Sequence, residues 1–182
     1  MGTRGLYGFH KGGQDKLTYN HWDSYPSRLG EQVVGFLLET PIEQLNTIFD
    51  EIIMVDGKTT PSPEEIEYYR QFADTGVSTG QLTEWYVLLR QTQGDLNFYK
   101  NGLKHMIDNR DFIKDSLFCE WAYIINLDTE MLEIYEGFQK KAHENRYTGA
   151  GHNRDGYWPC ALAKEVPLSN LENWYEGLEE VE

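Results

Sequence analysis

His21 and Asp23 flank Trp22 near the start of the chain, and their types and spacing could support chemistry. A histidine with a carboxylate two positions away can form an acid–base pair or half of a metal site. The alternative, which we favour, is that both side chains cap a turn between a strand and a helix. The other histidines show no ligand spacing: His10, His105, His143 and His152. We therefore expect no metal and no cofactor.

Other catalytic centres receive little support from the sequence. It contains neither a phosphate-binding P-loop motif nor the glycine motif of dinucleotide-binding folds. Thr3 lies one position too late for nucleophilic catalysis of the threonine-and-amine type, because that chemistry needs both groups on one residue. The sequence therefore predicts a protein that binds without catalysis. A hydrolase or phosphodiesterase that uses His21 and Asp23 is the alternative.

The first thirty residues have the composition of a nucleotide-binding surface. They contain four basic residues and two acidic ones, a formal charge of +2 in a chain whose net charge is −14. Aromatic rings that could stack on bases are Tyr7, Tyr19, Trp22 and Tyr25. Arg4 and Arg28 could each hold a phosphate through two parallel hydrogen bonds. The alternative is that these aromatic side chains belong to the core, since aromatic residues dominate cores as well as binding sites.

Residues 143–160 form a second stretch rich in glycine, asparagine, arginine and aromatic residues. Its basic and aromatic members are Arg146, Tyr147, Arg154, Tyr157 and Trp158. Long loops without their own secondary structure are often functional. We therefore include Arg154 and Trp158 among the predicted ligand-binding residues.

Periodicity predicts the elements that must position these side chains. Alternation predicts an N-terminal hairpin over residues 3–21, and the glycines in its first strand suggest the close approach of a backbone or ligand. Helical spacing follows across residues 27–108, with Thr40 and Ser62 as N-cap residues before Pro and Glu.

Alternation returns over residues 118–136 and predicts a second hairpin. The pattern that begins at Ser169 predicts a C-terminal helix over residues 169–180. Two hairpins separated by helices indicate a single α+β domain over residues 1–182. We expect an antiparallel sheet of at least four strands with several helices packed on it.

Composition excludes several classes of partner. A pI near 4.7 argues against duplex nucleic acid, whose binding requires many basic side chains, although a local arginine pair can still hold a small anion. No apolar run approaches the length of a membrane span, and no signal peptide is visible, so we expect a cytoplasmic protein. Cys119 and Cys160 are too few for a disulfide framework, so we expect reduced thiols.

Two stretches of the sequence resemble a widespread family of small proteins encoded by tailed phages. The first is the opening Met-Gly-Thr-Arg-Gly, and the second is Tyr-Asn-His-Trp-Asp-Ser-Tyr-Pro at residues 19–26. Members of that family typically open Met-Gly/Ser-Thr-Arg and carry a His-Trp-Asp-x-Tyr-Pro segment. The hairpin at residues 123–135 also looks like that family.

One branch of this family resembles anti-CBASS sponge proteins, which sequester cyclic dinucleotide immune signals without cleaving them and assemble as homotetramers. The resemblance implies a homo-oligomer in the host cytoplasm that binds a ligand such as cGAMP and blocks anti-phage defence. It implies a site built from Thr3, Arg4 and the segment from His21 to Tyr25, completed by a neighbouring subunit. A third interpretation is an acidic protein-interaction module that binds a basic host protein or mimics DNA.

Overall fold

A five-stranded sheet of order β2-β1-β5-β6-β7 forms the centre of the computed structural model, which describes residues 2–153 and 155–180. Its strands are β1 (Gly5–Lys11), β2 (Gln14–Asn20), β5 (Trp121–Asn126), β6 (Met131–Glu136) and β7 (Ala161–Pro167). Both predicted hairpins are present, and the predicted α+β class is confirmed. The expectation of an antiparallel sheet is wrong for the central pair, because β1 and β5 run parallel. The chain between these strands is long enough for the crossover that a parallel pair requires.

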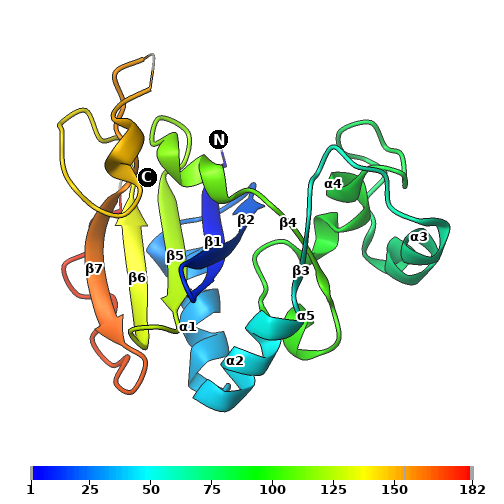
Figure 1. The fold of residues 1–182 in the computed structure, drawn as a ribbon, viewed down its shortest axis with the longest axis horizontal. Coiled ribbons are helices and arrows are strands. Elements are labelled where there is room, and N and C mark those ends of the chain that lie inside the picture. Colours follow the sequence, from blue (N-terminus) through cyan, green and yellow to red (C-terminus); the bar gives the residue numbers. More distant parts are fainter. Residues whose placement is uncertain (1, 154, 181–182) are drawn as a thin grey trace.

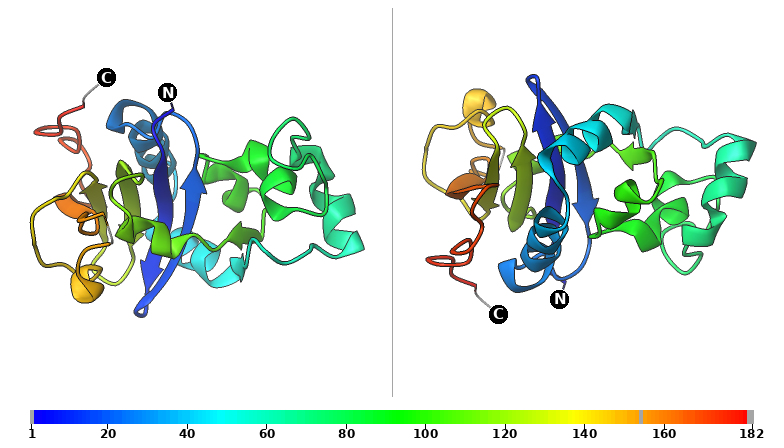
Figure 2. Two further views of the ribbon diagram at one scale, coloured as in Figure 1. Left: turned by 90° about the horizontal axis from the view of Figure 1, so that it is seen from above. Right: turned by 90° about the horizontal axis from the view of Figure 1, so that it is seen from below.

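The two faces of the sheet are covered by different parts of the chain (Figures 1 and 2). Helices α1 (Glu31–Leu38) and α2 (Ile42–Glu51) contribute to the core on one face. There the Phe9 ring meets Phe36 and Phe49 edge to face, each at 6.4 Å between centroids. The 143–160 loop lies over the other face, where it buries Tyr147 and Cys160.

A helical lobe lies beyond the β2 edge of the sheet (Figure 1). Strands β3 (Ile53–Val55) and β4 (His105–Ile107) pair in parallel at its base, and it contains α3 (Pro63–Tyr69), α4 (Trp85–Leu88) and α5 (Asn97–Lys100). The predicted N-cap at Ser62 is confirmed, because Ser62 and Glu65 exchange the reciprocal hydrogen bonds of a capping box. The helices described for residues 2–153 and 155–180 all lack the length and apolar character that a membrane span would need.

Several predicted boundaries in the helical region are wrong. Thr40 does not cap α2, because its hydroxyl donates to the Phe36 carbonyl at 2.6 Å and α2 begins only after Pro41. The helix expected from residue 27 divides into a π-helical turn (Pro26–Gly30) and α1. The helical region expected to continue to residue 108 contains only α5 after residue 95, before the chain extends into β4.

The C-terminal helix predicted over residues 169–180 is also wrong, because this segment consists of turns. Tertiary contacts hold it instead of a continuous helical ladder. Leu171 is buried in the core, and the Lys164 ammonium donates to the carbonyls of Asn173 and Glu176 at 2.5 and 2.6 Å. Lys164 belongs to β7, a strand that the sequence pattern did not indicate.

Replacement of Gly8 and of Gly35 by alanine is expected to change the free energy of unfolding in opposite directions. Gly8 in β1 has φ +147°, and an added Cβ would collide with the Lys16 carbonyl oxygen. We expect Gly8→Ala to lower the free energy of unfolding by about 2 kcal/mol or more. Gly35 in α1 has open space around the same position, so Gly35→Ala should raise it by about 0.5–1 kcal/mol. Urea denaturation measures both changes. A Gly35→Ala variant that is less stable than the natural protein would contradict the open space around this position.

Candidate functional site

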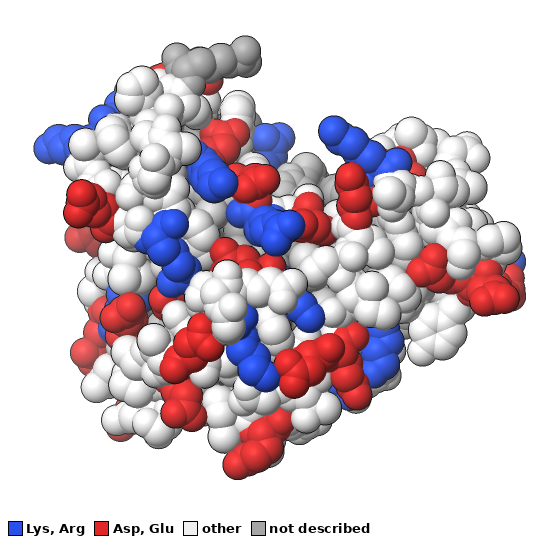
Figure 3. Space-filling model, viewed as in Figure 1, with Lys and Arg blue, Asp and Glu red and all other residues white. Residues whose placement is uncertain are grey.

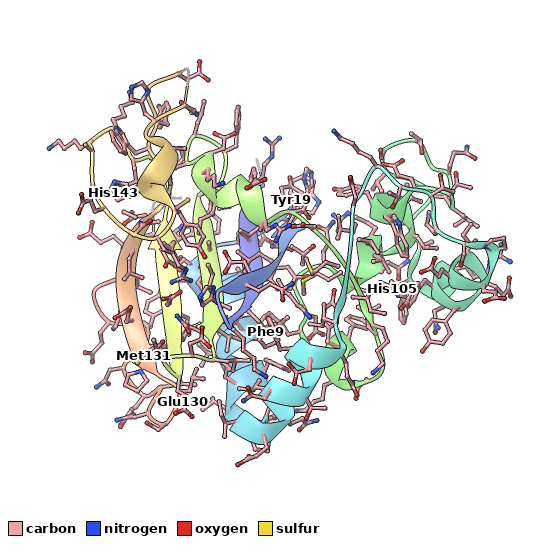
Figure 4. All side chains as sticks on the ribbon, in the orientation of Figure 1. Phe9, Tyr19, His105, Glu130, Met131 and His143 are labelled. Carbon is pink, nitrogen blue, oxygen red and sulfur yellow. The ribbon has the colours of Figure 1, made fainter. Side chains whose placement is uncertain are left out.

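The candidate site lies where the end of β2 faces the helical lobe. Figure 4 shows Tyr19 between the sheet and the lobe, and Figure 3 shows a recess there with acidic and basic side chains around it. The Tyr19 hydroxyl lies 2.7 Å from Nδ1 of His21, two residues further along the chain. Because residues two apart on a strand share a face, this pair is a direct consequence of the β2 geometry.

Aromatic rings surround Tyr19 on several sides. Phe112 meets it edge to face at 5.3 Å between centroids, and Tyr86 from the helical lobe lies tilted at 6.4 Å. The Arg4 guanidinium carbon lies 5.6 Å above the ring of Phe118, which is nearly half exposed. These π-faces could stack on nucleobases, and each such stack contributes about 1–3 kcal/mol in known single-strand binders.

Two arginines near Tyr19 make no close ion pair with the described residues, although the charge of Arg4 also acts on the carboxylate of Glu120. Across residues 2–153 and 155–180, the guanidinium groups of Arg4 and Arg90 make no ion pair and no hydrogen bond, although acidic residues outnumber basic ones 30 to 16. Nε of Arg90 is buried and unsatisfied. A buried donor without an acceptor carries an unfavourable desolvation cost, so the Arg90 guanidinium is an uncompensated positive charge in this part of the lobe.

The protonation of nearby groups reflects this positive charge. Burial, Arg90 and Arg4, in that order, lower the pKa of His21 from its ordinary value of 6.5. Burial raises the pKa of Tyr19 above its ordinary value of 10.0. At neutral pH both side chains are therefore uncharged, and the two guanidinium groups provide the local positive charge.

A cavity of about 150 Å³ lies beside the β2 edge. Tyr19, Tyr86, Gln93 and Asn109 are among its lining residues. A more open groove of about 590 Å³ shares Tyr19 and Asn109 with it, but its remaining lining is mainly acidic. A phosphate is therefore better placed on the arginine side of Tyr19 than in this groove.

The structure brings together Arg4, Tyr19 and His21 among the predicted ligand-binding residues, but it places others in the interior. Thr3 is only 2% exposed. Tyr7 is 1% exposed and lies in the main core, although its hydroxyl accepts a hydrogen bond from the Gly94 amide at 2.8 Å beside the cavity. Tyr25 is half-buried against the same core. The alternation of β1 explains this placement of Tyr7, because it points to the helix-covered face.

Trp22, Asp23 and Arg28 line a different groove, of about 620 Å³, between α1 and residues 93–97. The exposed Trp22 ring packs edge to face on His21 at 4.5 Å and therefore borders both regions. Asp23 has a left-handed backbone with φ +52°, and no hydrogen bond between described atoms joins it to His21. The side chains proposed as an acid–base pair thus have separate environments.

The 143–160 loop does not reach this site. Trp158 lies near His143 and His152, with centroid distances of 6.2 and 6.0 Å, and Figure 4 shows His143 across the sheet from Tyr19. The loop is held there by Arg146, whose guanidinium makes two hydrogen bonds to the buried Glu133. Arg154, also predicted to bind ligand, lies outside the described residues.

Sequence reasoning missed the residues that reach the site from distant elements. These are Tyr86, Arg90, Phe112 and Phe118. One feature of the sequence did indicate that Arg90 lacks a local partner. No acidic residue lies within four positions of it, so a local ion pair of the usual helical spacing is unattainable.

The sequence also contains one Gly-x-Ser-x-Gly motif, at residues 76–80, which sequence reasoning missed. Ser78 has φ +48°, but it lies in an exposed turn of the lobe rather than between a strand and a helix. Its hydroxyl donates to Glu84 at 2.7 Å, and no histidine contact to it is present in the described chain. The context of a hydrolase nucleophile is therefore missing.

Comparisons with family models, curated proteins and solved structures found no match to this chain. In the described ranges no group of three or more His, Cys, Asp or Glu side chains is arranged to hold a metal ion. The geometry around Tyr19 is thus the main guide to function.

Proposed function

We propose that this protein binds and sequesters a cyclic dinucleotide such as cGAMP, without cleaving it, at the cleft between β2 and the helical lobe. The observation that carries the proposal is the contact of Tyr19 with His21 at the end of β2, next to a cavity, with the charges of Arg4 and Arg90 acting on both side chains. Removal of such a signal from the host cytoplasm would block anti-phage defence, as the resemblance to phage sponge proteins suggests.

The chemistry of the ligand matches the cleft in two respects. Guanidinium groups form strong, charge-assisted hydrogen bonds with phosphate oxygens, and Arg4 and Arg90 are free to make them within the described structure. Aromatic faces at Tyr19 and Tyr86 are available to bases. The net charge of −14 repels a long nucleic acid, whereas a discrete ligand with few phosphates needs only the local charge.

The size of the cavity also bears on oligomerisation. Pockets that enclose small ligands usually measure about 300–1,000 Å³, which is larger than the 150 Å³ here. One end of a cyclic dinucleotide would enter the cavity while the rest occupies the open cleft. A second copy of the chain would then complete the enclosure, in keeping with the proposed homo-oligomer. The exposed rings of Trp22, which packs on His21, and Phe118, which lies under Arg4, offer apolar surface for it.

Recovery of the ligand after binding tests this proposal against its alternatives. The protein would be incubated with cGAMP, separated from unbound nucleotide and then heated, and the released material analysed by chromatography. Intact cGAMP supports sequestration, whereas a linear product supports the hydrolase alternative that uses His21 and Asp23. If no nucleotide is retained at any salt concentration, the proposal fails and the acidic protein-interaction module becomes the better interpretation.

Ligand affinity is expected to rise as the pH falls. A phosphate beside His21 would raise the pKa of its imidazole, which in the free protein lies below 6.5. Binding should therefore take up a proton in the window between the free and the bound pKa, and affinity should increase as the pH falls through that window. Calorimetry over a pH series that spans this window measures the effect. His21→Gln should flatten the profile, while the exposed His152→Gln should preserve it. An unchanged slope in His21→Gln would place the phosphate elsewhere.

A further inference from the structure

We propose that the cavity beside β2 selects guanine over adenine, through the amide groups of Asn109 and Gln93. This inference rests on the proposed function and deepens it, because it names the base that enters the cavity. The arrangement that supports it lies at the edge of the sheet, apart from the arginines.

β2 is an edge strand, and side-chain amides satisfy two of the outward N–H groups at its end. The Tyr19 amide donates to Oδ1 of Asn109 at 3.1 Å, and the His21 amide donates to Oε1 of Gln93 at 3.1 Å. Thr18 donates to the same Asn109 oxygen at 3.3 Å. Because a backbone N–H can only donate, these bonds fix which end of each side-chain amide faces the strand.

The nitrogen ends of both amides are left unpaired in the described chain, at the boundary of the cavity, where Gln93 and Asn109 each also line a neighbouring groove. Asn109 and Gln93 both line the cavity, and neither Nδ2 of Asn109 nor Nε2 of Gln93 has a hydrogen-bond acceptor among the described residues. The hydroxyl of Tyr7 accepts a bond from a backbone amide and so retains its own proton for donation, and Tyr86 adds a further hydroxyl. The amide nitrogens and the Tyr7 proton therefore supply donors, while Thr18 and Thr92, whose hydroxyls donate elsewhere, supply acceptors at other positions of the lining.

The unpaired amide donors of Asn109 and Gln93 require acceptors on the ligand edge that faces them. Guanine presents N7 and O6, two adjacent acceptors, on the edge away from its sugar. Adenine presents N7 beside an amino group, so its donor would face the donors of Asn109 or Gln93 and remain unsatisfied. Tyr19 and Tyr86 supply aromatic walls on which either purine could stack, so stacking does not discriminate between them.

Calorimetry with cyclic di-GMP, cGAMP and cyclic di-AMP tests the base preference. A bidentate contact to a base edge discriminates by about 1–3 kcal/mol, so cyclic di-GMP should bind about fivefold to 150-fold more tightly than cyclic di-AMP. The inosine analogue of cyclic di-GMP keeps N7 and O6 and should bind like cyclic di-GMP. The 7-deazaguanine analogue lacks N7 and should lose about fivefold or more.

The variant Gln93→Glu tests whether the base preference depends on hydrogen bonds from the Gln93 amide or only on the charge near the cavity. A carboxylate can still accept the His21 amide, but it offers an acceptor where the amide offered donors. The ratio of affinities for cyclic di-GMP and cyclic di-AMP should therefore fall about fivefold or more. Gln32→Glu adds the same charge on the exposed face of α1, outside the cavity, and should leave the ratio unchanged.

The possible outcomes distinguish this inference from the proposed function. Equal binding of all three cyclic dinucleotides, or a preference for cyclic di-AMP, overturns the guanine assignment but leaves sequestration standing. The guanine assignment also fails if Gln93→Glu and Gln32→Glu change the ratio alike. Failure of all three ligands to bind overturns both proposals. A guanine preference that disappears in Gln93→Glu, while circular dichroism shows a correctly folded protein, supports the inference.

Discussion

Replacement of Arg90 by alanine is expected to weaken cyclic dinucleotide binding by about 1.5–3 kcal/mol, roughly 10- to 150-fold. The reason is that Arg90 has no acceptor in the described structure and would gain one from the ligand phosphate. Arg4→Ala should have an effect of similar size, because Arg4 also lacks an ion pair there and its charge acts on both Tyr19 and His21. Calorimetry with cGAMP measures both losses.

The stability of these variants separates a binding role from a structural one. Since the Arg90 side chain is half-buried but makes no described hydrogen bond, its loss should change the free energy of unfolding by about 1 kcal/mol or less. Arg70→Ala is a matched control, because Arg70 lies in the same lobe, is exposed and pairs with Glu67. It should bind cGAMP normally. Unfolding of Arg4→Ala or Arg90→Ala would show that the residue is structural and that the phosphate site is misplaced.

Replacement of Arg146 by methionine is expected to destabilise the fold by about 3–5 kcal/mol. Arg146 holds both carboxylate oxygens of Glu133, at 2.8 and 2.5 Å, and the Glu133 side chain is only 4% exposed. Asn126 and Tyr135 also donate to Glu133, but neither carries charge. Without the guanidinium a buried carboxylate would be uncompensated. Urea denaturation monitored by fluorescence measures the loss.

Two control variants give the Arg146 prediction its specificity. The double variant Arg146→Met with Glu133→Leu removes both charges and should recover most of the lost stability. Lys114→Met breaks an exposed ion pair with Asp111 and should cost about 1 kcal/mol or less. If Arg146→Met is no worse than Lys114→Met, the pair contributes no more than a surface contact. Any variant that stays folded should bind cGAMP normally, because this loop lies away from Tyr19.

The hairpins could be predicted from sequence because their periodicity is local. The alternation of side chains along residues 121–126 and the turn before Met131 are properties of adjacent positions, and the capping box of Ser62 and Glu65 depends on a spacing of three. The prediction of a C-terminal helix failed because tertiary contacts outweighed local spacing. Its apolar spacing suited a helix, but the packing of Leu171 and the contacts of Lys164 favoured turns.

The candidate site was only partly predictable for a related reason. Arg4, Tyr19 and His21 were recognised because they belong to the N-terminal segment, where charge and aromatic composition are visible along the chain. Trp22, Asp23 and Arg28 were equally suitable by composition, yet they line another groove. Side-chain direction around a turn depends on backbone angles such as the positive φ of Asp23, and composition does not encode these.

The sequence by itself determined the chemistry available to this protein: an acidic chain with a basic, aromatic first segment, two hairpins and a capped helical region. Only the tertiary structure decided which of those groups meet. Tyr7 and Tyr19 face opposite sides of one hairpin, so the ring of Tyr7 belongs to the core, with its hydroxyl at the cavity, while Tyr19 belongs to the cleft. Arg90 arrives there because the helical lobe folds against the edge of β2. Such contacts depend on the packing of elements distant in sequence, which local spacing does not specify.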